Sequence, residues 1–208
     1  MKKFFAFIAA AFMAVSASAQ SEEGSFTLKP NVGFTYTTPT GDFGENADGA
    51  FALTAGVEGM YMVNEKFGAS IGLNYTGYNT KRKSVNVSSI LSGGKNLIDD
   101  VVYSNYYFNI PVMANYYVSE GLALKAGFAV NLLSTAKIDG YDEYDFGRLG
   151  KVEVKDMYKS TFFSIPVGVS YEFNDFVFDA RYNFGLGKVA EESDGSFNAL
   201  TFTVGYKF

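Results

Sequence analysis

Apolar and polar residues alternate along much of the chain, most clearly near its C-terminus. Between Leu200 and Phe208 every second residue is apolar, whereas the intervening residues are small or polar. The segment from Phe176 to Leu186 repeats this arrangement. Because successive side chains of a β-strand point to opposite faces, both segments are predicted to be strands with one apolar face.

Six further segments follow the same rule and bring the predicted strands to eight. They span residues 26–36, 51–62, 67–78, 106–116, 122–132 and 163–173. Tight turns are predicted at 64–65, 119–121 and 174–175, and long polar loops at 37–50, 79–101, 137–157 and 189–197. Alternating short and long connections are typical of a barrel in an outer membrane. The sequence therefore predicts an all-β fold, an eight-stranded antiparallel up-and-down transmembrane β-barrel.

Such a barrel must be closed, because hydrocarbon offers no water to an unpaired backbone group. We therefore expect the last strand to pair with the first. The order of short and long connections places both termini in the periplasm.

Charged residues inside the predicted strands all fall on the face opposite the apolar row. A shift of one residue would move them into lipid, at up to about 2–4 kcal/mol for each cation near the midplane. Eight strands enclose a lumen just wide enough for side chains to fill, so we expect a plug of paired charges. Asp179 and Arg181, two residues apart on one face, are candidates for an ion pair. The predicted lumen network consists of Lys29, Glu58, Lys125, Glu172, Asp179, Arg181 and Lys207.

Three prolines conflict with regular strands. Pro30, Pro111 and Pro166 lie within predicted strands, where proline cannot donate a hydrogen bond to the ladder. We expect local bulges or missing rungs there. The two Ile-Pro-Val segments, 110–112 and 165–167, are expected to share one geometry.

The N-terminus has the pattern of a signal peptide. Lys2 and Lys3 precede an apolar run from Phe4 to Val15, and Ala17-Ser18-Ala19 follows. The run is shorter than the roughly 20 residues of a membrane-spanning helix. We predict a signal peptide at 1–19, a barrel domain at 20–208 and export to the cell outer membrane.

The chain contains neither cysteine nor histidine. The first absence excludes disulfides and a lipid-modified cysteine. The second removes the histidine-dependent mechanisms of known barrel enzymes, and metal sites built on histidine or cysteine. No pair of acids stands out as the catalytic pair of a hydrolase that uses carboxylates alone. We therefore predict no enzyme activity and no cofactor. The net charge of −5 argues against nucleic acid as a partner.

The loops offer candidate contacts rather than a defined site. Tyr141, Tyr144 and Phe146 are candidate contacts for an extracellular protein or another surface ligand. The acids at 139, 142, 143 and 145 could hold calcium, although a solvated acidic loop is the simpler interpretation. Cations near the outer rim could contact lipopolysaccharide phosphates, and scattered solubilising charge explains them equally well. These cations are Lys81, Arg82, Lys83, Lys137, Lys151, Lys155, Lys159 and Lys188.

Several segments resemble a known family. They are Tyr-Tyr-Phe-Asn-Ile-Pro-Val at 106–112, Leu-Lys-Ala-Gly-Phe at 124–128, Phe-Asp-Ala-Arg-Tyr-Asn-Phe-Gly-Leu at 178–186 and Val-Gly-Tyr-Lys-Phe at 204–208. They are similar to the outer-membrane β-barrel domain family of Bacteroidetes, the porin family or PorT-like group, while residues 20–100 match only in pattern. The terminal Phe208 resembles the signal that such barrels present to the barrel assembly machinery. The resemblance implies a fold more than a pore.

Three functional hypotheses follow. The first is a non-enzymatic barrel in contact with outer-membrane lipid and lipopolysaccharide, displaying loops for binding or envelope support. The second is a narrow passive pore, or a barrel associated with transport or secretion. The third, a soluble lipocalin-like binder, would require apolar residues inside and charges outside.

Overall fold

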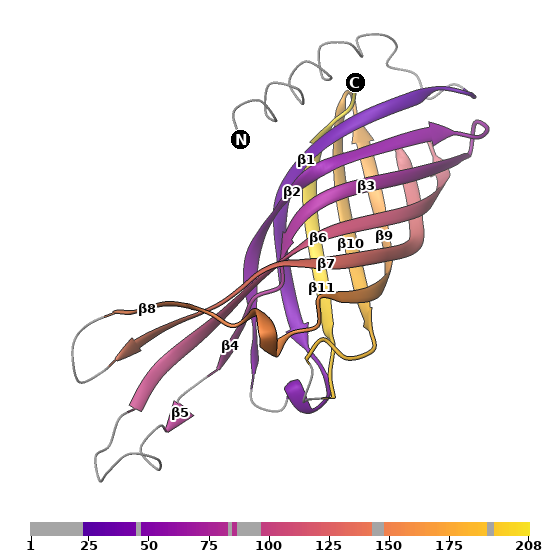
Figure 1. Cartoon of the computed structure of the whole chain (residues 1–208). Helices are drawn as coiled ribbons and strands as arrows, with labels where there is room; N and C mark the ends of the chain where they lie inside the picture. Colours follow the sequence, from indigo (N-terminus) through magenta and orange to yellow (C-terminus); the bar gives the residue numbers. More distant parts are fainter. Residues whose placement is uncertain (1–22, 45–46, 83–84, 87–96, 143–147, 191–193) are drawn as a thin grey trace.

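The structure of the chain, a computed structural model, describes residues 23–44, 47–82, 85–86, 97–142, 148–190 and 194–208. The predicted signal peptide at 1–19 lies outside the described residues. Within them, eight long antiparallel strands form a closed barrel, as predicted (Figure 1). The strands are β1 (Phe26–Pro39), β2 (Asp48–Met62), β3 (Phe67–Gly77), β6 (Leu97–Ser119), β7 (Leu122–Asp142), β9 (Thr161–Phe173), β10 (Phe176–Leu186) and β11 (Phe197–Tyr206).

The barrel is closed by pairing of β1 with β11. Asn31 lies opposite Gly205 and Phe34 lies opposite Phe202. Beyond that ladder, the backbone N–H groups of Leu28 and Phe208 each donate to the other residue's carbonyl, at 3.2 and 3.0 Å. The predicted pairing of the first and last strands is confirmed.

Alternation places the apolar row on the outside of the barrel. Phe178, Phe202 and Val167 are 48%, 39% and 36% exposed. The residues between them, such as Asp179 and Thr203, are buried in the lumen. This arrangement contradicts the lipocalin-like hypothesis, which requires the opposite orientation.

Tight turns connect the strands at one end of the barrel, at the three predicted places. Asn64 accepts hydrogen bonds from the backbone N–H groups of Lys66 and Phe67, both at 2.9 Å. Asn174 and Gly121 have φ values of 54° and 77°, the left-handed conformation that tight hairpins require. We call this end, which also holds Phe208, the turn end, and the opposite end the loop end.

At the loop end the strands are longer than predicted. β6 and β7 continue past the barrel and pair as far as Ile98 and Asp142. β4 (Thr80–Arg82) and β5 (Val85–Asn86) pair with β6, β8 (Arg148–Glu153) pairs with β7, and η2 (Lys155–Met157) follows. The predicted loops 79–101 and 137–157 thus contain strands, although their sequences lack the regular alternation of the barrel strands. We call β4, β5, β8 and residues 97–105 and 137–142 the arm, which projects from the barrel in Figure 1.

The remaining two loops are also shorter than predicted. β1 extends to Pro39 and β2 begins at Asp48, with η1 (Gly41–Phe43) between them. β11 begins at Phe197, so loop 189–197 ends one residue earlier.

Among the described residues, no helix has the length and apolar character needed to cross a membrane.

The three prolines remove rungs without shifting the register. Pairing between β3 and β6 omits Ile110 and Pro111, and pairing between β7 and β9 omits Ile165 and Pro166. The register is the same on both sides of each gap. Pro30 lies at the corresponding gap in the β1–β11 ladder. The expectation of missing rungs is confirmed, without bulges, and the two Ile-Pro-Val segments have gaps of the same form.

Candidate functional site in the barrel lumen

Five buried charges form a central cluster in the lumen. Glu58 Oε1 accepts hydrogen bonds from Lys29 Nζ at 3.1 Å and Lys125 Nζ at 2.8 Å. Lys125 Nζ also donates to Asp179 Oδ2 at 2.7 Å. Arg181 Nε donates to Asp179 Oδ1 at 2.5 Å, and its Nη1 lies 3.4 Å from Glu58 Oε2. Each of the five residues is at most 8% exposed, so the pairs are shielded from solvent.

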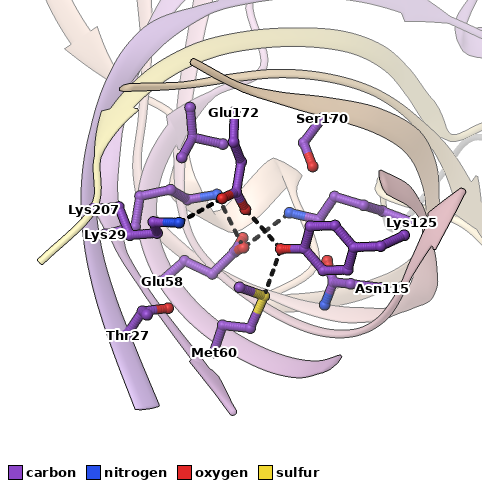
Figure 2. Close-up of a pocket in the computed structure, with 11 residues that line it drawn as sticks. Thr27, Lys29, Glu58, Met60, Asn115, Lys125, Ser170, Glu172 and Lys207 are labelled. Carbon is purple, nitrogen blue, oxygen red and sulfur yellow. Dashed lines mark hydrogen bonds and ion pairs between the residues drawn. The ribbon is translucent and has the colours of Figure 1, made fainter. Parts of the chain in front are cut away.

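The cluster draws on four strands, because alternation turns these residues to the same side of the sheet and Asp179 and Arg181 both lie on β10. Lys29 and Glu58 are direct cross-strand partners of β1 and β2. Lys125 reaches them from β7 across the lumen, and Figure 2 shows Glu58 between the two lysines. Three cations meet two anions here, and loss of one partner would leave an uncompensated buried charge.

A second, half-buried cluster lies nearer the turn end. Lys207 Nζ donates to Glu172 Oε2 at 2.6 Å, as Figure 2 shows, and Tyr117 OH donates to Glu172 Oε1 at 2.6 Å. Tyr117 OH also lies 3.5 Å from the Met60 sulfur. Sequence reasoning missed Tyr117, although it occupies the next inward position after Asn115.

On the loop-end side of the central cluster, the lumen is filled by neutral polar side chains. Asn109 Nδ2 donates to Asn131 Oδ1 at 2.7 Å, and Asn131 Nδ2 donates to Ser164 Oγ at 3.1 Å. Asn183 Nδ2 donates to Thr201 Oγ1 at 3.1 Å. These bonds satisfy buried amides without adding charge.

Aromatic side chains close the lumen at the loop end. The Tyr107 and Phe162 rings meet edge to face with centroids 5.0 Å apart, and Tyr78 stacks on Phe197 at 5.9 Å. Tyr78 OH donates to Asn131 Oδ1 at 3.1 Å, which joins this layer to the amide layer. We call this buried group the cap: Tyr78, Tyr107, Ala136, Tyr158, Phe162, Val189, Ala190, Phe197 and Ala199.

The cap corrects the prediction of a polar loop at 189–197. Val189 and Phe197 are fully buried. Lys159 N donates to Val189 O at 2.9 Å, and Tyr158 forms an isolated bridge with Ala190. The apolar ends of this segment fold into the mouth, whereas its polar middle gave the sequence pattern of a loop.

Two small cavities lie between these layers. One is lined by the turn-end and central clusters, and the other by Arg181 and the amide layer. Each has a volume of about 10 Å³, which is about the space needed for one water molecule. The described part of the lumen therefore holds isolated waters more readily than a column of water.

The rim cations do not gather into one site. Lys188 pairs with Asp194, and this hydrogen bond raises the pKa of Lys188. The Arg82 guanidinium lies 5.6 Å from the centre of the Tyr103 ring. Lys81 and Lys155 are exposed, Lys137 and Lys159 are half-buried, and the side chains of Lys83 and Lys151 lie outside the described part.

The remaining predicted contacts fall mostly beyond the described residues. The backbone of Tyr141 pairs with Arg148 in the arm, whereas Tyr144 and Phe146 lie outside the described residues. Phe208 packs its ring against Tyr206, with centroids 4.8 Å apart. Among the described residues, no group of three acids could hold a metal ion.

Comparisons with known proteins agree with the barrel. A family model described as outer membrane protein beta-barrel domain matches residues 5–208. Neisserial surface protein A is 18% identical, with a TM-score of 0.53 over 90% of this chain and 100% of that chain. Ail of Yersinia pestis is 16% identical, with a TM-score of 0.50 over 89% and 99%. Identities this low show the fold alone, and no curated protein sequence matches.

Proposed function

We propose that this chain, which belongs to the outer membrane protein beta-barrel domain family, is a non-enzymatic scaffold of the cell outer membrane. Its lumen is plugged, and its loop end presents the arm for binding a surface ligand or supporting the envelope. One observation carries the proposal: polar clusters and the cap fill the lumen, while β6 and β7 continue beyond it.

Conductance in planar bilayers tests the plug. The purified barrel is expected to give no steady current, because its two lumen cavities each hold about one water. A steady single-channel current from the unmodified protein would contradict the plug. That result would favour the second candidate, a narrow pore or transport-associated barrel, for which the polar lining of both cavities is the supporting observation.

The proposed orientation places the turn end in the periplasm and the arm outside the cell. Short turns at one end and a long extension at the other support this orientation. In this proposal residues 1–19 are a cleaved signal peptide, and Phe208 is read by the barrel assembly machinery. Mass spectrometry of protein from isolated outer membranes is expected to find Gln20 as the first residue. An intact Met1 in that membrane would contradict the cleavage.

Binding through the arm is tested by pull-down from intact cells. A variant with the arm shortened in 79–101 and 137–157 is expected to lose the captured partner, including any partner that contacts Tyr141, Tyr144 or Phe146. The matched control shortens the connection around η1 (Gly41–Phe43), at the same end of the barrel. Equal capture by both variants would contradict loop display.

The finer family assignment is also a proposal. The segments at 106–112 and 178–186 support a PorT-like barrel of the Bacteroidetes type. In such a membrane, the exposed cations Lys81 and Lys155 would meet lipopolysaccharide phosphates.

A further inference from the structure

The outer surface of the barrel carries a hollow over β9, β10, β11 and β1. Its volume is about 450 Å³. The outward side chains around it are all apolar, and they include Val32, Phe34, Val169, Phe178 and Phe202. Ser170, Asp179 and Thr203 also border it, but these three residues are buried. The hollow is thus an apolar depression in the surface that faces lipid.

One small residue explains the depression. Ala180 lies opposite Val169 on one side and Phe202 on the other, and Phe202 lies opposite Phe34. The next outward position toward the turn end is Phe178. A methyl group therefore stands where its neighbours carry rings and branched chains, and the missing side-chain volume becomes the hollow.

We propose that this hollow binds one acyl chain of a membrane phospholipid. The hollow is continuous with the lipid-facing surface of an outer-membrane barrel, so the medium at its mouth is hydrocarbon. Left unfilled, its walls would lose dispersion contacts on one side. An unbranched flexible chain can follow the depression and restore those contacts.

The alternative occupants fit less well. A partner strand cannot join this part of the sheet, because β9, β10, β11 and β1 are each paired on both sides. One turn of a helix about 10 Å wide and 5.4 Å long occupies roughly 420 Å³. The hollow therefore holds little more than a single helical turn, too short a contact for a helical partner.

The level of the hollow indicates the leaflet. Tyr171 and Leu122 border it on the turn-end side, and Leu122 is the first residue of β7 after the turn. The chain therefore enters from the leaflet at the turn end. With the orientation given under the proposed function, on which only this step rests, that leaflet is the periplasmic one.

Photocrosslinking tests the site. The barrel is placed in nanodiscs with a phosphatidylethanolamine that carries a diazirine near the methyl end of one acyl chain. In the unmodified protein, labelling is expected to concentrate on Phe34, Val169, Ala180 and Phe202, which line the side of the hollow away from the turn end. Even labelling around the whole barrel would overturn the proposal.

Ala180→Phe fills the hollow with a ring and is expected to lower this labelling at least fivefold. Ala114→Phe is the matched control, because Ala114 also faces outward but lies on β6, away from the hollow. Ala180→Leu, a smaller change, is expected to give an intermediate loss and guards against a folding defect in the larger variant. Unchanged labelling in both Ala180 variants would overturn the site.

Two further outcomes separate the parts of the proposal. A second probe with its diazirine near the chain's carboxyl end is expected to label 171–178, and the reverse order would overturn the leaflet assignment. If Ala180→Phe converts a dimer into a monomer, the occupant is a second copy of the chain and the lipid proposal fails. None of these readouts depends on conductance or on the arm.

Discussion

Among single residues, Glu58 holds the central cluster together, because it contacts Lys29, Lys125 and Arg181 at once. Its carboxylate lies at the centre of the lumen and is 2% exposed. Placing charges there costs desolvation that good pairing must offset. The cluster is therefore a feature whose loss is costly even if its formation adds little net stability.

Glu58→Gln is expected to lower the free energy of unfolding by about 3–5 kcal/mol, because three buried cations would retain only Asp179 as counter-ion. Urea unfolding in lipid vesicles measures the change. The control is Glu153→Gln, which removes an exposed carboxylate 3.9 Å from Lys155 and is expected to change stability little. Equal effects of the two substitutions would contradict the role given to Glu58.

Sequence reasoning placed the charged residues on the inward face, but it did not predict the aromatic cap. Lys125 or Asp179 on the outer face would cost several kcal/mol in hydrocarbon, so their side of the strand follows from alternation alone. An inward Tyr107 or Phe162 carries no such penalty. The contacts of the cap depend on where the neighbouring segment folds, which the local pattern does not encode.

At the scale of elements, the strands inside the membrane follow from the sequence, whereas the arm and the cap do not. Lipid on one side and a packed lumen on the other impose a period of two on β9, β10 and β11. That constraint ends where β6 and β7 leave the membrane. Residues 97–105 are extended because they pair with the neighbouring strand.

The cap is expected to seal the lumen from the loop end. Thr35 lies in the lumen beneath the cap and is fully buried, so Thr35→Cys places a single thiol in a chain without cysteine. Adding Phe197→Ala is expected to raise its labelling by a charged thiol reagent roughly tenfold, because part of the seal is removed. Adding Phe202→Ala, on the outer face of the same strand, is the control. Equal labelling rates in the two double variants would contradict the seal.

The missing rungs predict how a new amide would behave. Pro111→Ala supplies a backbone N–H donor in the gap between β3 and β6, opposite Gly72. Because the register is unchanged across the gap, the backbone of β3 lies within reach as the acceptor. The new amide is expected to be protected from hydrogen exchange, as measured by NMR. Pro166→Ala should behave the same way, since its gap has the same form. Fast exchange at one site and slow exchange at the other would refute the shared geometry.

For the whole molecule, closure depends on a close approach of β1 and β11. A Cβ built on Gly33 would lie 1.8 Å from the carbonyl oxygen of Phe202, closer than any real contact. The strands at this seam can therefore pack only around a glycine. The seam joins the first strand of the barrel to the last, so the barrel closes only when both strands have formed.

Gly33→Ala is expected to reduce the fraction of chains that fold into lipid vesicles, because the added methyl group separates β1 from β11. Gly59→Ala is the control, since its nearest neighbour is the flexible Phe26 ring at 3.0 Å rather than backbone. Circular dichroism and protease resistance report the folded fraction. Similar folded fractions for both variants would show that the seam tolerates a side chain.

The uninterrupted course of β6 and β7 also has a mechanical consequence. One hairpin runs from the Ser119–Leu122 turn through the barrel wall and out into the arm. A pulling force on the arm would act along the axes of β6 and β7. It would therefore load their hydrogen bonds with β3 and β9 in shear. Such a shear load is shared by many hydrogen bonds at once instead of opening them one by one. A force applied to the arm is therefore transmitted to strands that span the full depth of the membrane.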